Sequence, residues 1–146
     1  DIGRKTTVKR MLTVVLCAAL MLALCACGGD VSGVQTREVE SEIYSDRDIA
    51  SAINVIKREF ALRWNGCTLR EIYYAGDERT QAETRYYLKE HEIYDADELI
   101  VLLSSFDVDG TGGDGSLNPN STYNNWAWIL VRSSAGGWRH VDHGYG

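Results

Sequence analysis

The sequence predicts an α+β domain in which a curved antiparallel sheet carries its helices on one face. Two observations predict this class. An amphipathic helical pattern opens the folded part, and three strand-like runs close it after a strand and a second helix. Helices and strands that do not alternate throughout favour an antiparallel sheet over a parallel one. We expect a single domain with one core over residues 46–146.

The first helix is predicted to begin after Ser45. Ser45 can cap the helix, and Asp48 three residues later completes a variant of the capping box. The apolar residues of one face recur at helical spacing and are Ile49, Ala52, Ile53, Ile56 and Phe60. This face is expected to lie in the core.

A strand and a second helix follow. "CTLREIYY" at 67–74 alternates and is rich in residues that favour strands. "DERTQAETRYYLKEH" at 77–91 contains strong helix formers, and a helix there places Ala82, Tyr86 and Lys89 on one side.

Three strands complete the domain. "DELIVLLSSFDVD" at 97–109 is an unbroken apolar run bounded by acidic residues, which indicates a central strand buried on both faces. In "YNNWAWILVR" at 123–132, one face carries Trp126, Trp128 and Leu130 and the other carries Ala127, Ile129 and Val131. "GWRHVDHGY" at 137–145 comes after the turn "SSAGG", so these last two strands are expected to form a hairpin.

Residues 1–26 are predicted to be a lipoprotein signal peptide. Basic residues precede an apolar run over 11–26, which is shorter than the roughly 20 residues that a membrane-spanning helix needs. "LCAC" at 24–27 resembles the lipobox of bacterial lipoproteins, with Cys27 as the lipidated residue. An ordinary secreted protein is the alternative. The polar segment 27–45 has no apolar period and is predicted to be a flexible tether.

The charge that remains after cleavage excludes two classes of partner. Removal of residues 1–26 takes away four of the 15 basic and one of the 21 acidic residues, which leaves a net charge of about −9. Nucleic acid and anionic membrane faces both require clustered Lys and Arg. With Cys27 lipidated, Cys67 has no partner for an intramolecular disulfide and is expected to be a buried, unreactive thiol.

A long glycine-rich connection, "FDVDGTGGDGSLNPN" at 106–120, contains a G-x-G-x-x-G pattern. A nucleotide site would need a helix immediately after it, but Pro119 and polar residues follow. Asp107, Asp109 and Asp114 could instead offer oxygen ligands to calcium within 107–118, although Asn118 replaces the closing Glu of a calcium-binding loop. The simpler interpretation is a loop whose glycines form turns. No other cofactor is expected.

The last strand holds the candidate catalytic residues. His140 and Asp142 would share a face with Trp138, as general base and orienting carboxylate, whereas His143 would project from the opposite face. Because His140 and His143 would lie on opposite faces, a zinc site is disfavoured. Local hydrogen bonding of the imidazoles is the simpler alternative to catalysis. Trp126 and Trp128 could stack on a carbohydrate, but tryptophans at strand spacing favour the core.

Four segments together resemble a known family. They are "DIASAINVIKREF", "GCTLREIYY", "IVLLSSFDVDGTGGDGSLNPNSTYNNWAWILVR" and "WRHVDHGYG". They are similar to small lipoproteins of Gram-positive bacteria that carry a domain of unknown function, grouped with the NTF2-like (cystatin-like) cone folds. The resemblance covers nearly all of residues 46–146. It implies a fold and a compartment, and no activity.

The function expected from the sequence is that of a ligand-binding or protein-interaction module. It would be lipid-anchored on the extracytoplasmic face of a bacterial cell membrane, with an unidentified ligand or protein as its partner. An enzyme with a pocket on the concave face of the sheet, using His140 and Asp142, is one alternative. A surface domain stabilised by calcium at 107–118 is another.

Overall fold

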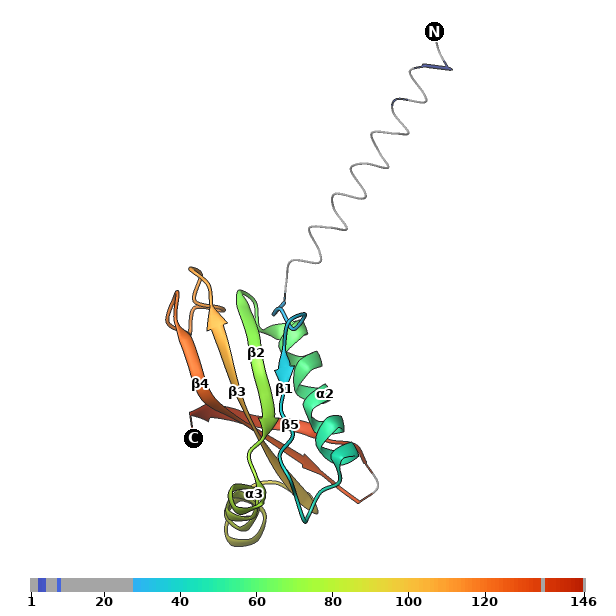
Figure 1. Ribbon diagram of the computed structural model, residues 1–146, viewed down its shortest axis with the longest axis vertical. Coiled ribbons are helices and arrows are strands. Elements are labelled where there is room, and N and C mark those ends of the chain that lie inside the picture. The colour runs from blue at the N-terminus through green and yellow to red at the C-terminus, as the bar shows by residue number, and fades with distance from the viewer. Residues whose placement is uncertain (1–2, 5–7, 9–27, 135, 146) are drawn as a thin grey trace.

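The chain folds into an α+β structure with one mixed sheet (Figure 1). This computed structural model describes residues 3, 4, 8, 28–134 and 136–145. Its elements are β1 (Gln35–Thr36), α2 (Asp46–Arg63), β2 (Cys67–Tyr74), α3 (Asp77–Thr84), the π-helical segment η1 (Arg85–Glu90), β3 (Glu98–Val108), β4 (Thr122–Arg132) and β5 (Arg139–Tyr145). Cys27 and most of the predicted signal peptide lie outside the described residues. Within the described part, no helix is long and apolar enough to cross a membrane.

The sheet has the order β1-β2-β3-β4-β5. The four strands that the sequence predicts pair antiparallel, with β3 in the centre, as expected. The short strand β1 was not predicted, and it pairs parallel to β2. The sheet is therefore mixed, because β1 reaches the edge of β2 and α2 then forms the crossover.

The helices lie on opposite faces of the sheet, so the prediction that they share one face is wrong. α2 covers one face, where Ile56 and Phe60 pack against Leu102 and Trp128. Leu88 of η1 belongs to a separate cluster on the other face. The members of that cluster are Leu88, Leu99, Val101, Ala127, Ile129 and Val131. Because β3 and β4 are apolar on both faces, each face needs its own cover.

The sheet curves around α2. β5 pairs with β4, yet it also contacts α2, which lies alongside β1 and β2 in Figure 1. Just before β5, the Trp138 indole Nε1–H donates to the Asp48 carbonyl oxygen at 3.2 Å. α2 therefore occupies the concave face, which is where β5 and the end of α2 can form a site together.

The first helix forms as predicted. The Ser45 hydroxyl accepts from Asp48 N–H, and the Asp48 carboxylate accepts from Ser45 N–H, which completes the capping box. Four of the five predicted apolar positions are buried, namely Ala52, Ile53, Ile56 and Phe60.

The second helix does not bury the side that carries Ala82, Tyr86 and Lys89. Ala82, Tyr86 and Lys89 are exposed, and Thr80 and Leu88 are buried instead. Thr80 is fixed in the core because its hydroxyl accepts from Val101 N–H at 3.3 Å. Helical periodicity then breaks at η1, so positions beyond residue 84 no longer follow a 3.6-residue spacing.

The segment 28–45 differs from the flexible tether that the sequence predicts. Asp30 N–H donates to Cys67 O at 2.9 Å, and Leu69 N–H donates to Asp30 O at 2.8 Å. The apolar side chains Val31, Val34, Val39 and Tyr44 pack against the core on the α2 face. The segment shows no helical or strand period because most of it packs along the edge of β2 in an irregular conformation.

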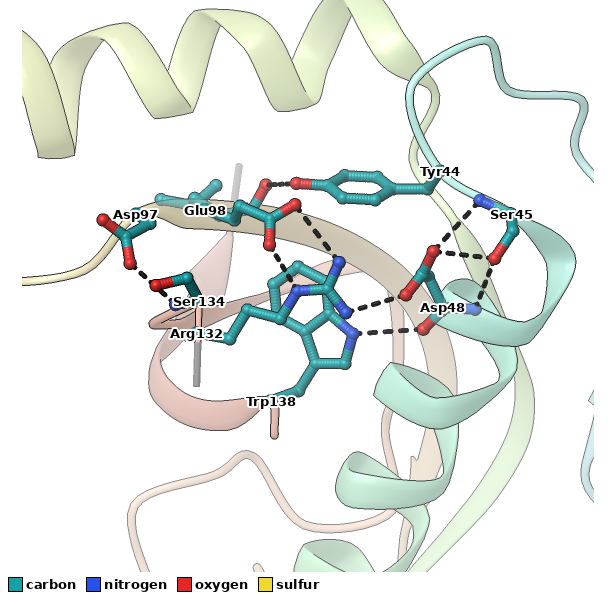
Figure 2. A network of polar contacts seen from close by, with 9 residues as sticks. Tyr44, Ser45, Asp48, Asp97, Glu98, Arg132, Ser134 and Trp138 are labelled. Carbon is teal, nitrogen blue, oxygen red and sulfur yellow. Dashed lines mark hydrogen bonds and ion pairs between the residues drawn. The ribbon is translucent and has the colours of Figure 1, made fainter. Parts of the chain in front are cut away.

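A polar network joins the start of α2 to the sheet (Figure 2). The Arg132 guanidinium donates to Glu98 through Nε at 2.6 Å and to Asp48 through Nη1 at 2.7 Å. It also lies 4.2 Å above the Trp138 ring. Tyr44 completes the network by donating to Leu99 O at 2.9 Å. This network fixes the end of α2 that is distant from the pocket described below.

Candidate functional site

The candidate calcium loop forms separate side-chain turns. Asp109 accepts from Thr111 N–H at 2.8 Å, and Asp114 accepts from Ser116 N–H at 2.9 Å. Asp107 is bound by Thr122 at 2.7 Å and by Arg70 at 2.6 Å. In the part of the chain that the structure describes, no group of three or more His, Cys, Asp or Glu side chains is arranged to hold a metal ion.

The glycines of this loop form turns. Gly112, Gly113 and Gly115 have φ values of 74°, 66° and 94°, a region that L side chains rarely adopt. Gly115 N–H donates to Gly112 O at 2.9 Å, which closes one of these turns. The loop leads directly into β4, so no helix N-terminus follows that could bind a phosphate.

A cavity of about 480 Å³ lies between the C-terminal end of α2, the loop 109–121 and strands β4 and β5. Its aromatic wall consists of Trp64, Trp126 and His143. Polar and other lining residues are Glu59, Arg63, Asn65, Cys67, Gly113, Asp114, Ser116 and Leu117. Trp64 was not singled out from the sequence, although it lies four residues after Phe60 and continues the apolar spacing of the helix.

A β-bulge in β5 decides which side chains of that strand reach this face. Asp142 pairs with Ile129 and His140 pairs with Leu130, so Val141 is the extra residue. His143 pairs with Trp128. Because Trp128 and Leu130 face α2, His140 and His143 both face α2 as well. The prediction that His143 projects from the opposite face is therefore wrong.

The bulge also separates the predicted catalytic pair. Asp142 lies opposite Ile129 and so belongs to the other face of the sheet. Its carboxylate accepts from His143 N–H at 2.8 Å, and the His140 imidazole contacts the Asp142 backbone carbonyl instead. Burial, and then the neighbouring His143, lower the pKa of His140. The arrangement of a base oriented by the Asp142 carboxylate is not formed.

The structure pairs the two imidazoles with each other. His140 Nε2 lies 3.2 Å from His143 Nδ1, and the rings are stacked with an interplanar angle of 26°. His140 Nδ1 lies 3.9 Å from Glu59 of α2, a residue that sequence reasoning missed. The four-residue spacing of Glu59 and Arg63, whose side chains lie 3.5 Å apart, was the one signal that they share a side of the helix.

The tryptophans of β4 belong to the core, as expected from their spacing in the sequence. Trp128 is fully buried, and its indole N–H donates to the Ser104 hydroxyl at 2.8 Å. Trp126 is 8 % exposed, and its Nε1 has no hydrogen-bond partner among the described residues. A buried N–H left without a partner costs about 1–3 kcal/mol.

Cys67 lies at the base of the cavity and is buried, as expected. Burial, with Asp109 and Asp114 nearby, raises the pKa of its thiol to about 11. The thiol form is therefore favoured at neutral pH, which disfavours Cys67 as a nucleophile.

No family model, curated protein or solved structure matches this chain. The resemblance to small Gram-positive lipoproteins therefore stays a prediction.

Proposed function

We propose that this chain is an extracytoplasmic lipoprotein, anchored through Cys27, whose domain binds a small ligand in the cavity between α2, β4 and β5. The domain would be a member of the NTF2-like (cystatin-like) cone folds, although its sheet includes the parallel strand β1. The observation that carries the proposal is a cavity of about 480 Å³ whose aromatic wall includes Trp126, a residue with a buried indole N–H that has no partner among the described residues.

The cavity has the size and lining of a small-molecule site. Such sites commonly span roughly 300–1,000 Å³ and combine apolar walls with a few polar groups. Trp64 and Leu117 supply apolar contact, while Glu59 and Asn65 supply polar groups. A ligand with a hydrogen-bond acceptor that reaches Trp126 Nε1 would provide the partner that this N–H lacks.

The position of Gly28 supports an anchor close to the cavity. A Cβ atom at Gly28 would lie 1.9 Å from Ala61 O, and Gly29 N–H donates to Phe60 O at 3.1 Å. The chain therefore meets the domain at the end of α2 that carries Trp64. A lipid on Cys27 would hold this end, and the cavity with it, near the membrane surface.

The two alternatives drawn from the sequence have less support. An enzyme that uses His140 and Asp142 would need the carboxylate and the imidazole on one face, and the bulge separates them. A calcium site at 107–118 would need carboxylates that converge, and each of the three has partners of its own.

The proposal is tested with the full chain by saturation-transfer NMR against defined probes: glucose, N-acetylglucosamine and glycylglycine. At least one probe is expected to bind. Trp126→Phe should weaken that binding because it removes the N–H and keeps most of the ring. The matched control is Trp128→Phe, whose lost hydrogen bond is to Ser104 and not to the cavity. Absence of binding by all the probes, or equal binding by Trp126→Phe, would count against the proposal.

A further inference from the structure

Three atoms on β5 converge at the edge of the cavity. His140 Nε2 lies 3.2 Å from His143 Nδ1 and 3.1 Å from Asp142 O. The bulge at Val141 is what brings them together, because a regular strand would place the two imidazoles on opposite faces. Two ligand nitrogens at this separation can both reach one metal ion at the usual distance of roughly 2.0–2.1 Å.

The groups on both sides of the His140 ring favour a positive charge there. Its Nδ1 faces the Glu59 carboxylate at 3.9 Å, and its Nε2 faces a carbonyl oxygen and the second imidazole. A neutral imidazole carries one N–H, so it can match only one of these two sides. A metal ion at Nε2, with the N–H on Nδ1 toward Glu59, satisfies both sides with a neutral ring.

We propose that His140 Nε2 and His143 Nδ1 form a two-histidine site for a divalent transition metal such as Zn²⁺. Imidazole is a preferred ligand of Zn²⁺, and the Asp142 carbonyl oxygen supplies a third contact. Glu59 takes the place of the carboxylate that commonly orients a metal-binding histidine. His143 lines the cavity and His140 does not, so the site lies at the edge of the cavity.

The two rings are held in place before any metal binds. His143 contacts Trp64 and Trp128 with ring centroids 5.2 and 5.4 Å apart, and His140 contacts Trp128 at 5.3 Å. Trp128 is fully buried. Rings packed in this way lose little rotamer freedom on binding, which favours a site even with only two side-chain ligands.

The test is equilibrium dialysis of the full chain with Zn²⁺, and absorption spectroscopy with Co²⁺. We expect one metal ion per chain, lost in both His140→Gln and His143→Gln. His91→Gln is the control, because the His91 ring packs on Tyr86 of η1 and not in the cavity. Glu59→Gln should weaken the affinity by about 10- to 100-fold. Near-ultraviolet circular dichroism shows that each variant keeps its packed aromatic core.

Two results would overturn the proposal. One is wild-type protein that binds neither ion. The other is binding that persists in His140→Gln and His143→Gln, and a Co²⁺ spectrum with thiolate charge-transfer bands would then assign the metal to cysteine. Zinc binding is measured without the sugar and dipeptide probes, so failure here and failure of the proposed ligand site can be distinguished.

Discussion

Arg132 connects three segments that are distant in sequence. It binds Glu98 at the start of β3, Asp48 in the first turn of α2, and the ring of Trp138 just before β5 (Figure 2). Its side chain is 21 % exposed. The hydrogen bonds to Glu98 and Asp48 raise the pKa of Arg132, so it is charged throughout the accessible pH range.

Arg132→Met should lower the free energy of unfolding by roughly 2–3 kcal/mol, because it leaves two partly buried carboxylates without their cation. The measurement is urea denaturation. Arg70→Met is the matched control, since Arg70 pairs with Asp107 but is 61 % exposed, and its loss should cost less than about 1 kcal/mol. Equal losses in the two variants would show that the network does not stabilise the fold.

Asp77 makes the domain sensitive to acid. Its carboxylate accepts from the Ser41 hydroxyl at 2.6 Å and from Glu42 N–H at 2.8 Å, and these bonds lower its pKa. A carboxyl group with a lowered folded-state pKa stabilises the fold above its unfolded pKa, about 3.9, and that stability is lost as the pH falls through the folded value.

Wild-type stability should therefore fall as the pH drops below about 4, and Asp77→Asn should show a smaller fall from a lower starting stability. Thermal unfolding as a function of pH measures both. Asp48 and Asp107 also have lowered pKa values, so the stability of the Asp77→Asn variant should still decrease at low pH. Parallel pH profiles for the two proteins would contradict the role of Asp77.

Part of the site could be predicted from residue types, and its geometry could not. His140, His143 and Cys67 stand out in the sequence. The bulge at Val141 gives no signal in the sequence, because "WRHVDHGY" alternates like a regular strand. One extra residue nevertheless reverses the face of every residue beyond it. Glu59 is one of many charged helix residues, and only the curvature of the sheet brings it to His140.

At the scale of elements, the patterns with a strong period were predicted well. α2 and its cap, and the alternation of β2 and β4, follow from local spacing. The segment 28–45 was misjudged because its valines contact the core without any regular period. The buried face of the second helix could not be predicted, because Thr80 is held in the core by Val101 and the helix widens at η1.

The docked segment can be tested by proteolysis. In the full chain, trypsin should cleave after Arg37 slowly, because Arg37 lies 3.6 Å from the Tyr73 ring and the chain next to it pairs with β2. Val34→Asp should speed cleavage there, since it buries a charge against the core. Mass spectrometry of the fragments gives the rate. Equally fast cleavage in both proteins would show that the segment is a free tether.

At the scale of the whole molecule, the sheet brings the end of α2 and the bulged strand β5 to the same cavity, and residues 28–29 contact Phe60 and Ala61 near that end of α2. The aromatic wall and the histidine pair are consequences of one curvature. The net charge of the whole chain is −6, because acidic side chains outnumber basic ones. Binding through a defined cavity fits this surface better than binding through a charged patch.

The metal site and the cavity wall both depend on the register of β5, which nuclear Overhauser effects from the histidine ring protons measure directly. The bulge predicts contacts from His143 to the indoles of Trp64 and Trp128, and from His140 to Trp128. A regular strand would instead turn His143 toward Tyr87 and Leu88 on the opposite face. That result would contradict both the metal site and the wall of the proposed ligand cavity.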